Sequence, residues 1–186
     1  MKTVTATIEG VSPYSPGRAI QSAKATGESH EAFEERTWKE RIHADSKGNV
    51  FIPAVAIKLC LEDCATFLSE TVKGKGKATW TKHFKAGIMC VQNAYIGQTV
   101  EDVEKEKLFV PSDGRKGGST RVWKSFPIFQ EWIAEIEIIV LDPLLIDNTD
   151  KIREYLDHSG KFIGLGRWRP RNGGTNGRFK LIDFKG

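Results

Sequence analysis

The stretch that organises the whole chain is Gly160-Lys-Phe-Ile-Gly-Leu-Gly-Arg-Trp-Arg-Pro-Arg-Asn-Gly-Gly-Thr-Asn-Gly-Arg-Phe-Lys180. Its glycines permit positive φ and a close approach of the backbone to a ligand. Its arginines carry planar guanidinium groups that suit phosphate, and Trp168 offers a flat face for a base. An alternating strand pattern follows at 178–184, which favours an ordered loop over a disordered tail. The stretch therefore predicts a loop between the last helix and the last strand, with a surface for a polyanion, most simply nucleic acid.

Upstream of this loop, the hydrophobic pattern predicts alternating strands and helices. The strongest helix follows Pro53, whose fixed φ suits a helix start, and its apolar residues recur at helical spacing to about Thr71. A short helix is expected from Asn148, with Gly160 ending it. The predicted strands are 2–10, 50–52, 86–96, 131–141 and 178–184.

Two polar stretches interrupt this order. Residues 18–49 lack apolar periodicity and are expected to form an insertion or flexible loop, anchored by Phe33 and Trp38. Residues 97–127 are expected to form a protruding basic hairpin. Without them the order is β-α-β-β-α-β. The sequence thus predicts one α+β domain over 1–186, with a ferredoxin-like (RRM-like) antiparallel sheet and two helices.

Composition supports a globular protein, because 39% of the 186 residues are hydrophobic and 28% are charged. The three cysteines, an odd number, argue against a disulfide framework, and Cys60 and Cys64 are expected in the core. The chain shows no secretion signal and no apolar run long enough to cross a membrane. We therefore expect a soluble cytoplasmic protein that does not bind membranes.

The net charge is only +4, so where the charges lie matters more than their sum. One basic run is Lys73-Gly-Lys-Gly-Lys-Ala-Thr-Trp-Thr-Lys-His-Phe-Lys85, whose glycine and lysine spacing does not match a nucleotide-hydrolysing phosphate loop. Another covers 113–124, the tip and return arm of the expected hairpin. Each run alone is equally consistent with a solubilising loop.

Together, three separate basic segments that each carry a tryptophan favour binding of a single strand. Cations give salt-sensitive affinity for the phosphate backbone, and aromatic faces stack on splayed bases. Trp80 and Trp123 are further stacking candidates, although at least one of the five tryptophans is expected in the core. The candidate nucleic-acid-binding residues are Lys58, Lys73, Lys75, Lys77, Arg115, Lys116, Arg121, Arg167, Trp168, Arg169 and Arg171.

The sequence offers little for catalysis. Its four histidines form no metal-ligand spacing with each other or with the cysteines, so no metal or other cofactor is expected. The one constellation for metal-independent RNA cleavage is His30 or His43 beside Tyr14, acting as general acid and base. A surface histidine in a polar loop is the simpler interpretation, and we expect no enzymatic activity.

Three motifs resemble the RAMP superfamily, the RRM-like proteins of CRISPR systems, and its guide-RNA backbone subunits in particular. The first is Glu9-Gly-Val-Ser-Pro-Tyr-Ser-Pro16 after the first strand. The second is Gly48-Asn-Val-Phe-Ile-Pro-Ala-Val-Ala-Ile-Lys58 at the entry to the first helix. The third, residues 163–179, is similar to the family's C-terminal glycine-rich loop, whose basic residues face RNA.

This resemblance implies a ferredoxin-like fold with a protruding hairpin, and subunits stacked head-to-tail along a strand. The implied partners are a guide RNA, further copies of the chain and other CRISPR effector subunits, in antiviral defence. A compact phage-encoded relative that coats single-stranded DNA or RNA stays open, with RNA favoured. Two alternatives also stay open: a metal-independent RNA-processing endonuclease of the same superfamily, and a protein-interaction module or inhibitor that mimics a backbone subunit. No acidic residue of the early loops corresponds to the target-cleaving aspartate of some members.

Overall fold

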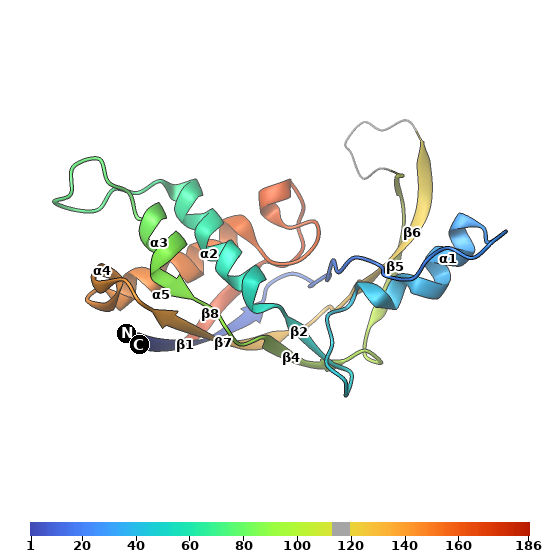
Figure 1. Cartoon of the computed structure of the whole chain (residues 1–186), viewed down its shortest axis with the longest axis horizontal. Coiled ribbons are helices and arrows are strands. Elements are labelled where there is room, and N and C mark those ends of the chain that lie inside the picture. The colour runs from blue at the N-terminus through green and yellow to red at the C-terminus, as the bar shows by residue number, and fades with distance from the viewer. Residues whose placement is uncertain (113–119) are drawn as a thin grey trace.

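The computed structural model describes residues 1–112 and 120–186. Its centre is a four-stranded antiparallel sheet in the order β3–β7–β1–β8 (Figure 1). The first and third strands of the βαββαβ order occupy the middle of the sheet. This is the ferredoxin-like (RRM-like) arrangement, so the predicted fold class is confirmed. The sheet strands are β1 (Lys2–Gly10), β3 (Ile88–Met89), β7 (Ile133–Val140) and β8 (Phe179–Lys185).

Helices cover one side of this sheet (Figure 1). They are α2 (Ala54–Leu68), α3 (Thr81–Gly87) and α5 (Thr149–His158). Alternate residues of β1 and β7, such as Ala6 and Ile136, are buried beneath them, as expected for a strand with one covered face. Phe84 of α3 stacks on Tyr155 of α5 with ring centroids 4.4 Å apart. The core therefore lies between the sheet and this helical layer.

Helix α2 begins directly after Pro53, as its sequence predicts. The side-chain oxygen of Asn93 accepts a 3.1 Å hydrogen bond from the Ala54 backbone N–H, one of the donors that a helix start leaves free. The helix ends at Leu68, where Ser69 adopts a left-handed conformation with φ 48°. Cys60 and Cys64 are buried on its inner face, and burial raises the pKa of their thiols to about 12 and about 11.

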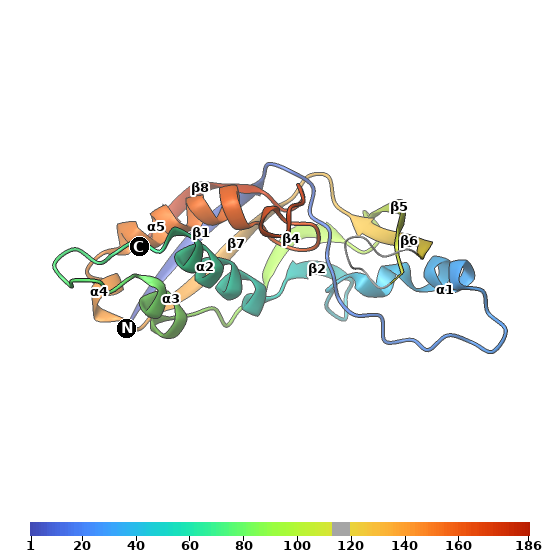
Figure 2. The same ribbon diagram turned by 90° about the horizontal axis from the view of Figure 1, so that it is seen from above.

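A second part of the molecule extends from the sheet (Figures 1 and 2). Strand β2 (Asn49–Ile52) pairs with β4 (Ala94–Thr99), and β5 (Glu104–Pro111) pairs with β6 (Arg121–Ile128). The β5–β6 pair is the predicted protruding hairpin, running from Glu104 opposite Ile128 to Pro111 opposite Arg121. The predicted site residues Arg115 and Lys116 lie outside the described residues.

The expectation of an irregular insertion at 18–49 is partly wrong. It contains helix α1 (His30–Thr37) and a 3-10 turn, η1 (Trp38–Arg41). The Ser29 hydroxyl caps α1 by accepting a 3.1 Å bond from the Ala32 N–H. Buried Glu34 of α1 pairs with Arg41 at 2.9 Å, and this ion pair holds the insertion in place. An ion pair leaves no apolar periodicity in the sequence, so the pattern does not predict the helix.

Two boundaries also differ from prediction. The expected strand 86–96 is divided among the end of α3, the short β3 and the start of β4. Gly160 does not end α5, because the chain continues through a π-helical turn, η2 (Ser159–Ile163), to Gly164 at φ 73°. A Cβ at Gly160 would lie 2.0 Å from the Phe179 carbonyl oxygen, so this glycine is needed for packing against β8. The remaining helical turns are α4 (Pro143–Ile146) and η3 (Pro170–Asn172).

Candidate nucleic-acid interface

Residues 164–178, called the glycine–arginine loop below, are held in place by backbone hydrogen bonds. The Arg167 N–H donates to the Ser15 carbonyl at 2.7 Å, and the Gly177 N–H donates to the Pro13 carbonyl at 2.7 Å. A Cβ at Gly177 would lie 1.8 Å from the Leu165 carbonyl oxygen. The prediction of an ordered loop between the last helix and strand is therefore confirmed, and several of its glycines serve packing within the protein.

Trp168 lies at the most constrained point of this loop. Its φ is 54°, a left-handed conformation that a bulky side chain rarely adopts. A Cβ at Gly174 would lie 1.8 Å from the Trp168 carbonyl oxygen, so only glycine fits beneath it. The indole side chain is nevertheless 42% exposed. Such strain persists only where the surroundings impose it, and it concentrates at functional sites.

Arg167 joins the glycine–arginine loop to the base of the hairpin. Its guanidinium carbon lies 3.4 Å from the centroid of the Phe126 ring and its Nη2 lies 3.5 Å from a carboxylate oxygen of Glu106. Arg41 also lies over Phe126, at 5.0 Å. Burial lowers the pKa of Arg167 to about 10, and its side chain is only 16% exposed. Arg167 therefore fixes the loop as well as supplying charge.

Arg169 and Arg171 join the same loop to α2. Both approach the carboxylate of Asp63, at 3.4 Å and 3.0 Å respectively. One carboxylate compensates one of these two charges, so the pair keeps a net positive charge. Arg171 is the more exposed of the two and is the better placed for an external phosphate.

The predicted lysines form a separate group. Lys73, Lys75 and Lys77 are exposed on the turn between α2 and α3. In both views this turn lies at the opposite end of the molecule from the β5–β6 hairpin, with η3 of the glycine–arginine loop between them (Figures 1 and 2). Lys58 is engaged by the protein, since its ammonium contacts Glu62 and donates to the Lys85 carbonyl at 2.8 Å.

The hairpin contributes a further aromatic site. Arg121 is exposed at the start of β6. Trp123, also exposed, packs against Phe109 with ring centroids 5.2 Å apart. Sequence reasoning missed Phe109, although the cross-strand register of a hairpin predicts such a pair.

Two tryptophans belong to the core, as expected for at least one. Trp132 is buried, and its indole N–H donates to the Ser12 carbonyl at 2.9 Å. Trp80 is only 7% exposed and packs beside His83. The prediction that Trp80 stacks on a base is therefore wrong, because its ring has no accessible face.

The uncovered side of the sheet has an excess of acidic side chains, with Glu9, Glu135, Glu137 and Asp183 against Lys180 and Lys185. RRM proteins bind RNA on this side, through aromatic residues that stack on bases. Here Glu135 lies opposite Thr7, and Glu137 lies opposite Thr5, on the face away from the helices. Carboxylates in these positions repel phosphate, so the electrostatics favour the helix-and-loop side for nucleic acid.

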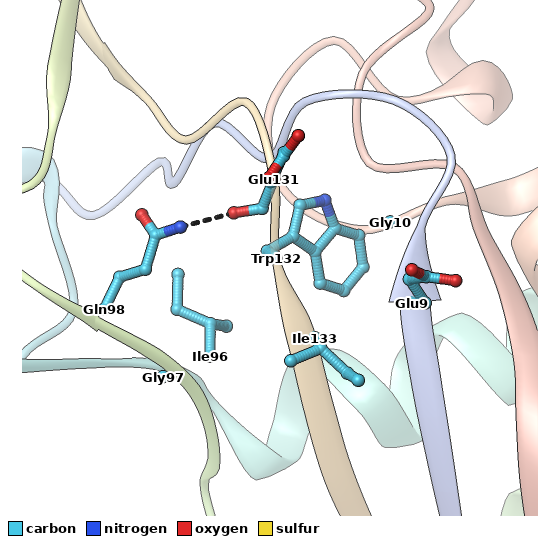
Figure 3. Close-up of a pocket in the computed structure, with 8 residues that line it drawn as sticks. All are labelled: Glu9, Gly10, Ile96, Gly97, Gln98, Glu131, Trp132 and Ile133. Carbon is cyan, nitrogen blue, oxygen red and sulfur yellow. Dashed lines mark hydrogen bonds between the residues drawn. The ribbon is translucent and has the colours of Figure 1, made fainter.

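A pocket of about 500 Å³ at the ends of β1 and β7 is also lined by acidic side chains. Glu9 and Glu131 line it on either side of the Trp132 ring (Figure 3). The Gln98 amide donates to the Glu131 carbonyl across the other wall (Figure 3). Glu9 is paired with Lys180, but the two carboxylates still leave a net negative charge, which disfavours a polyanion here as well.

The proposed acid–base constellation loses its tyrosine. Tyr14 is buried against Trp132, with ring centroids 5.7 Å apart, and burial raises the pKa of its hydroxyl. Buried in this way, the hydroxyl is not accessible to an RNA substrate. His30 is exposed at the start of α1, whereas His43 packs against Phe51, and burial lowers its pKa. The ribonuclease alternative then depends on a histidine without this partner.

Within residues 1–112 and 120–186, no three His, Cys, Asp or Glu side chains are grouped closely enough to hold a metal ion. In the same residues, no helix has the length and apolar character needed to cross a membrane.

Comparisons with known proteins give a similarity of fold. No family model matches the sequence, and no curated protein matches it. Among solved structures, the chain is similar to a chain of the Type III-B Cmr-beta bound to cognate target RNA, solved by cryo-EM, with a TM-score of 0.56 and 12% identity. The match covers 98% of this chain but 59% of the other, so this chain spans about three fifths of that chain's length. What the two share is the RRM-like fold.

Proposed function

We propose that this protein binds single-stranded nucleic acid, RNA in preference to DNA, and assembles head-to-tail along the strand without cleaving it. The observation that carries the proposal is the conformation and exposure of Trp168. Its backbone has a positive φ, its large aromatic ring is about half-exposed, and the arginines of the same loop keep a net positive charge. An aromatic face next to cations is the arrangement that binds unpaired nucleotides.

The positions of the other groups suggest a path for the strand. Arg121 and the Phe109–Trp123 pair lie on the hairpin, Arg167 connects the hairpin base to Trp168, and Arg171 lies beside α2. The acidic side of the sheet lies away from this path. A strand crossing the helix-and-loop side would therefore meet cations and aromatic faces in turn.

The preference for RNA and the assembly rest on similarity. The fold is shared with a chain of the Type III-B Cmr-beta bound to cognate target RNA, and the sequence motifs resemble those of CRISPR backbone subunits. A head-to-tail contact uses different surfaces on each copy and so continues into a filament. Other CRISPR effector subunits are the proposed protein partners.

The central test measures affinity for a labelled single-stranded RNA, the matching DNA and an RNA duplex over a salt series. Trp168→Ala is expected to cost about 1–3 kcal/mol of binding free energy, the usual loss for a stacked base, or about 5- to 150-fold in Kd. Tyr95→Ala is the matched control, since Tyr95 is 49% exposed but lies on β4 beside Asp45. Equal affinity for all three nucleic acids, or no binding at low salt, would contradict the proposal.

Two further measurements separate the alternatives. RNA incubated with the protein in EDTA is expected to stay intact, whereas cleavage that His30→Ala or His43→Ala abolishes would establish the endonuclease. The mass of the protein is expected to rise in steps when a long oligonucleotide is added. A stable complex with a protein partner, formed without nucleic acid, would favour the interaction module.

A further inference from the structure

A pocket of about 760 Å³ lies on the α2 side of the glycine–arginine loop. Its walls come from the end of α2, the π-helical turn η2, the turn η3 and the residue before β8. Apart from Phe67, all of its lining residues belong to the Gly160–Lys180 stretch, and the fold brings the end of α2 against that stretch. Its size is within the range of pockets that take small organic ligands.

Two aromatic rings form the apolar part of this pocket. Phe67, at the end of α2, is 57% exposed, and Phe162, in η2, is 44% exposed. Their ring centroids are 5.5 Å apart and the planes are inclined by 31°. Both rings are therefore partly accessible to a flat ligand.

Three cations also line the pocket. Arg171 and Arg178 line the pocket together with Lys161, and no carboxylate is among the lining residues, all of which the structure describes. Arg178 donates to the Lys161 carbonyl and, among the described residues, has no carboxylate partner. Lys161 and Arg171 are paired with Asp157 and Asp63, which flank the pocket. The mouth therefore carries an uncompensated positive charge next to two aromatic faces.

We propose that this pocket holds one nucleotide of the bound strand, with its base on Phe162 and Phe67 and its phosphate on Arg171 and Arg178. This deepens the proposed function and rests on it. Aromatic faces accept any base, and guanidinium groups grip phosphate through two parallel hydrogen bonds. Asn172 also lines the pocket and offers both a donor and an acceptor to a base edge.

Continuity with the rest of the interface favours a strand over other occupants. Arg171 follows Trp168 by three residues on the same loop, and that loop spans from the hairpin base to α2. A strand that stacks on Trp168 would reach the pocket with its next nucleotides. The pocket would then set how the strand leaves the protomer.

The test combines a variant with an altered oligonucleotide. The double variant Phe67→Leu/Phe162→Leu keeps apolar volume at exposed positions but removes both flat faces, so the fold should survive. It is expected to weaken binding of single-stranded RNA by about 5- to 20-fold, within the range for loss of a stacked base. An RNA with one abasic nucleotide, moved along the sequence, should show one position where the wild type loses affinity and the double variant loses none.

Arg178→Gln tests the charged part of the pocket. This variant should lower the affinity for RNA and reduce the salt dependence of that affinity.

Each other outcome overturns the inference in a recognisable way. If the double variant binds RNA as the wild type does while Trp168→Ala still weakens binding, the pocket is not used and the proposed function stands. If neither change matters, the strand lies elsewhere on the protein and both the pocket and the Trp168 site are wrong. If the wild type does not bind RNA at low salt, the proposed function fails as well. If the double variant alters only the mass of the protein without RNA, the rings form a protein contact. If adenosine monophosphate binds and the RNA does not displace it, the pocket serves a free nucleotide.

Discussion

The glycine–arginine loop and the lysine loop (residues 69–80) have similar compositions but different structures. In the first, a Cβ added at Gly174 or at Gly177 would lie 1.8 Å from a backbone oxygen. In the second, a Cβ added at Gly74 or at Gly76 would have nothing within 4 Å. The arginines of the first loop contact Asp63 and Glu106. In the second, the side chains of Lys73, Lys75 and Lys77 are exposed, and no described residue accepts a hydrogen bond from their ammonium groups.

This difference indicates that the two loops would contribute to binding in different ways. The glycine–arginine loop is shaped before any ligand arrives, which lowers the ordering cost of binding and favours defined contacts. The lysine loop offers long, free side chains, which attract phosphate in a salt-dependent way and with little geometry. A stretch rich in glycine and cations can therefore form either a rigid, packed binding site or an open loop that attracts phosphate by charge alone. The packing of its glycines in the folded protein shows which of the two it is.

The largest expected effect tests whether the glycines of the glycine–arginine loop are packed more tightly than those of the lysine loop. Gly177→Ala places a methyl group against the Leu165 carbonyl at φ 69°, and should cost about 3–4 kcal/mol of unfolding free energy, from left-handed strain plus a displaced loop. Gly74→Ala is the matched control, with φ 77° but open space, and should cost only about 1–2 kcal/mol. Urea denaturation measures both. Equal losses would show that the two loops are not packed differently.

A second prediction concerns the electrostatic half. Replacing Lys73, Lys75 and Lys77 by glutamine should flatten the dependence of log K on log salt by about 2, since each phosphate contact on a single strand contributes about 0.7. Arg171→Gln should remove no more than one such contact. Fluorescence anisotropy titrations at several salt concentrations measure the slopes. An unchanged slope in the triple variant would mean that the lysine loop lies outside the nucleic-acid path.

A third prediction concerns the carboxylate that competes with phosphate for the loop arginines. Asp63→Asn frees Arg169 and Arg171 and should strengthen RNA binding by about 0.5 kcal/mol, or about 2-fold, the scale of a partly exposed ion pair. The same change should weaken the fold by a similar amount. Glu28→Gln, which frees Arg36 in the insertion and no candidate RNA-binding residue, is the control. A loss of RNA affinity in Asp63→Asn would show that the ion pairs orient the arginines for binding.

The regular parts of the fold follow from local patterns. Alternation predicts β1 and β7 closely, and Pro53 with helical spacing predicts α2. Helix α1 escaped prediction because Glu34 and Arg41 stabilise it from within the insertion and it packs on the hairpin. An ion pair between charged residues has no hydrophobic period, so sequence patterns do not reveal it.

Only part of the candidate site can be predicted from the sequence, because the rest depends on contacts between residues that are far apart in the chain. Composition finds Trp168 and its arginines, but not that Arg167 stacks on Phe126, distant in the chain. It also does not show that Trp80 is core while Trp123 is exposed. The pocket at Phe67 and Phe162 depends on contacts between four elements. Such contacts are a property of the tertiary fold, and no local pattern encodes them.

The smallest expected effect compares Ser69 and Trp168, the non-glycine residues with positive φ in the described structure, one in each loop. Ser69→Gly relieves left-handed strain at the end of α2 and loses the 2.7 Å bond from its hydroxyl to the Thr66 carbonyl, so the net gain in stability should be only about 0.5 kcal/mol. RNA affinity should not change. Trp168→Gly relieves the same kind of strain but should lose RNA affinity, because it removes the ring that we propose stacks on a base. Thermal unfolding and RNA titration of both variants measure this, and a Trp168→Gly variant that binds RNA normally would place the strand elsewhere on the protein.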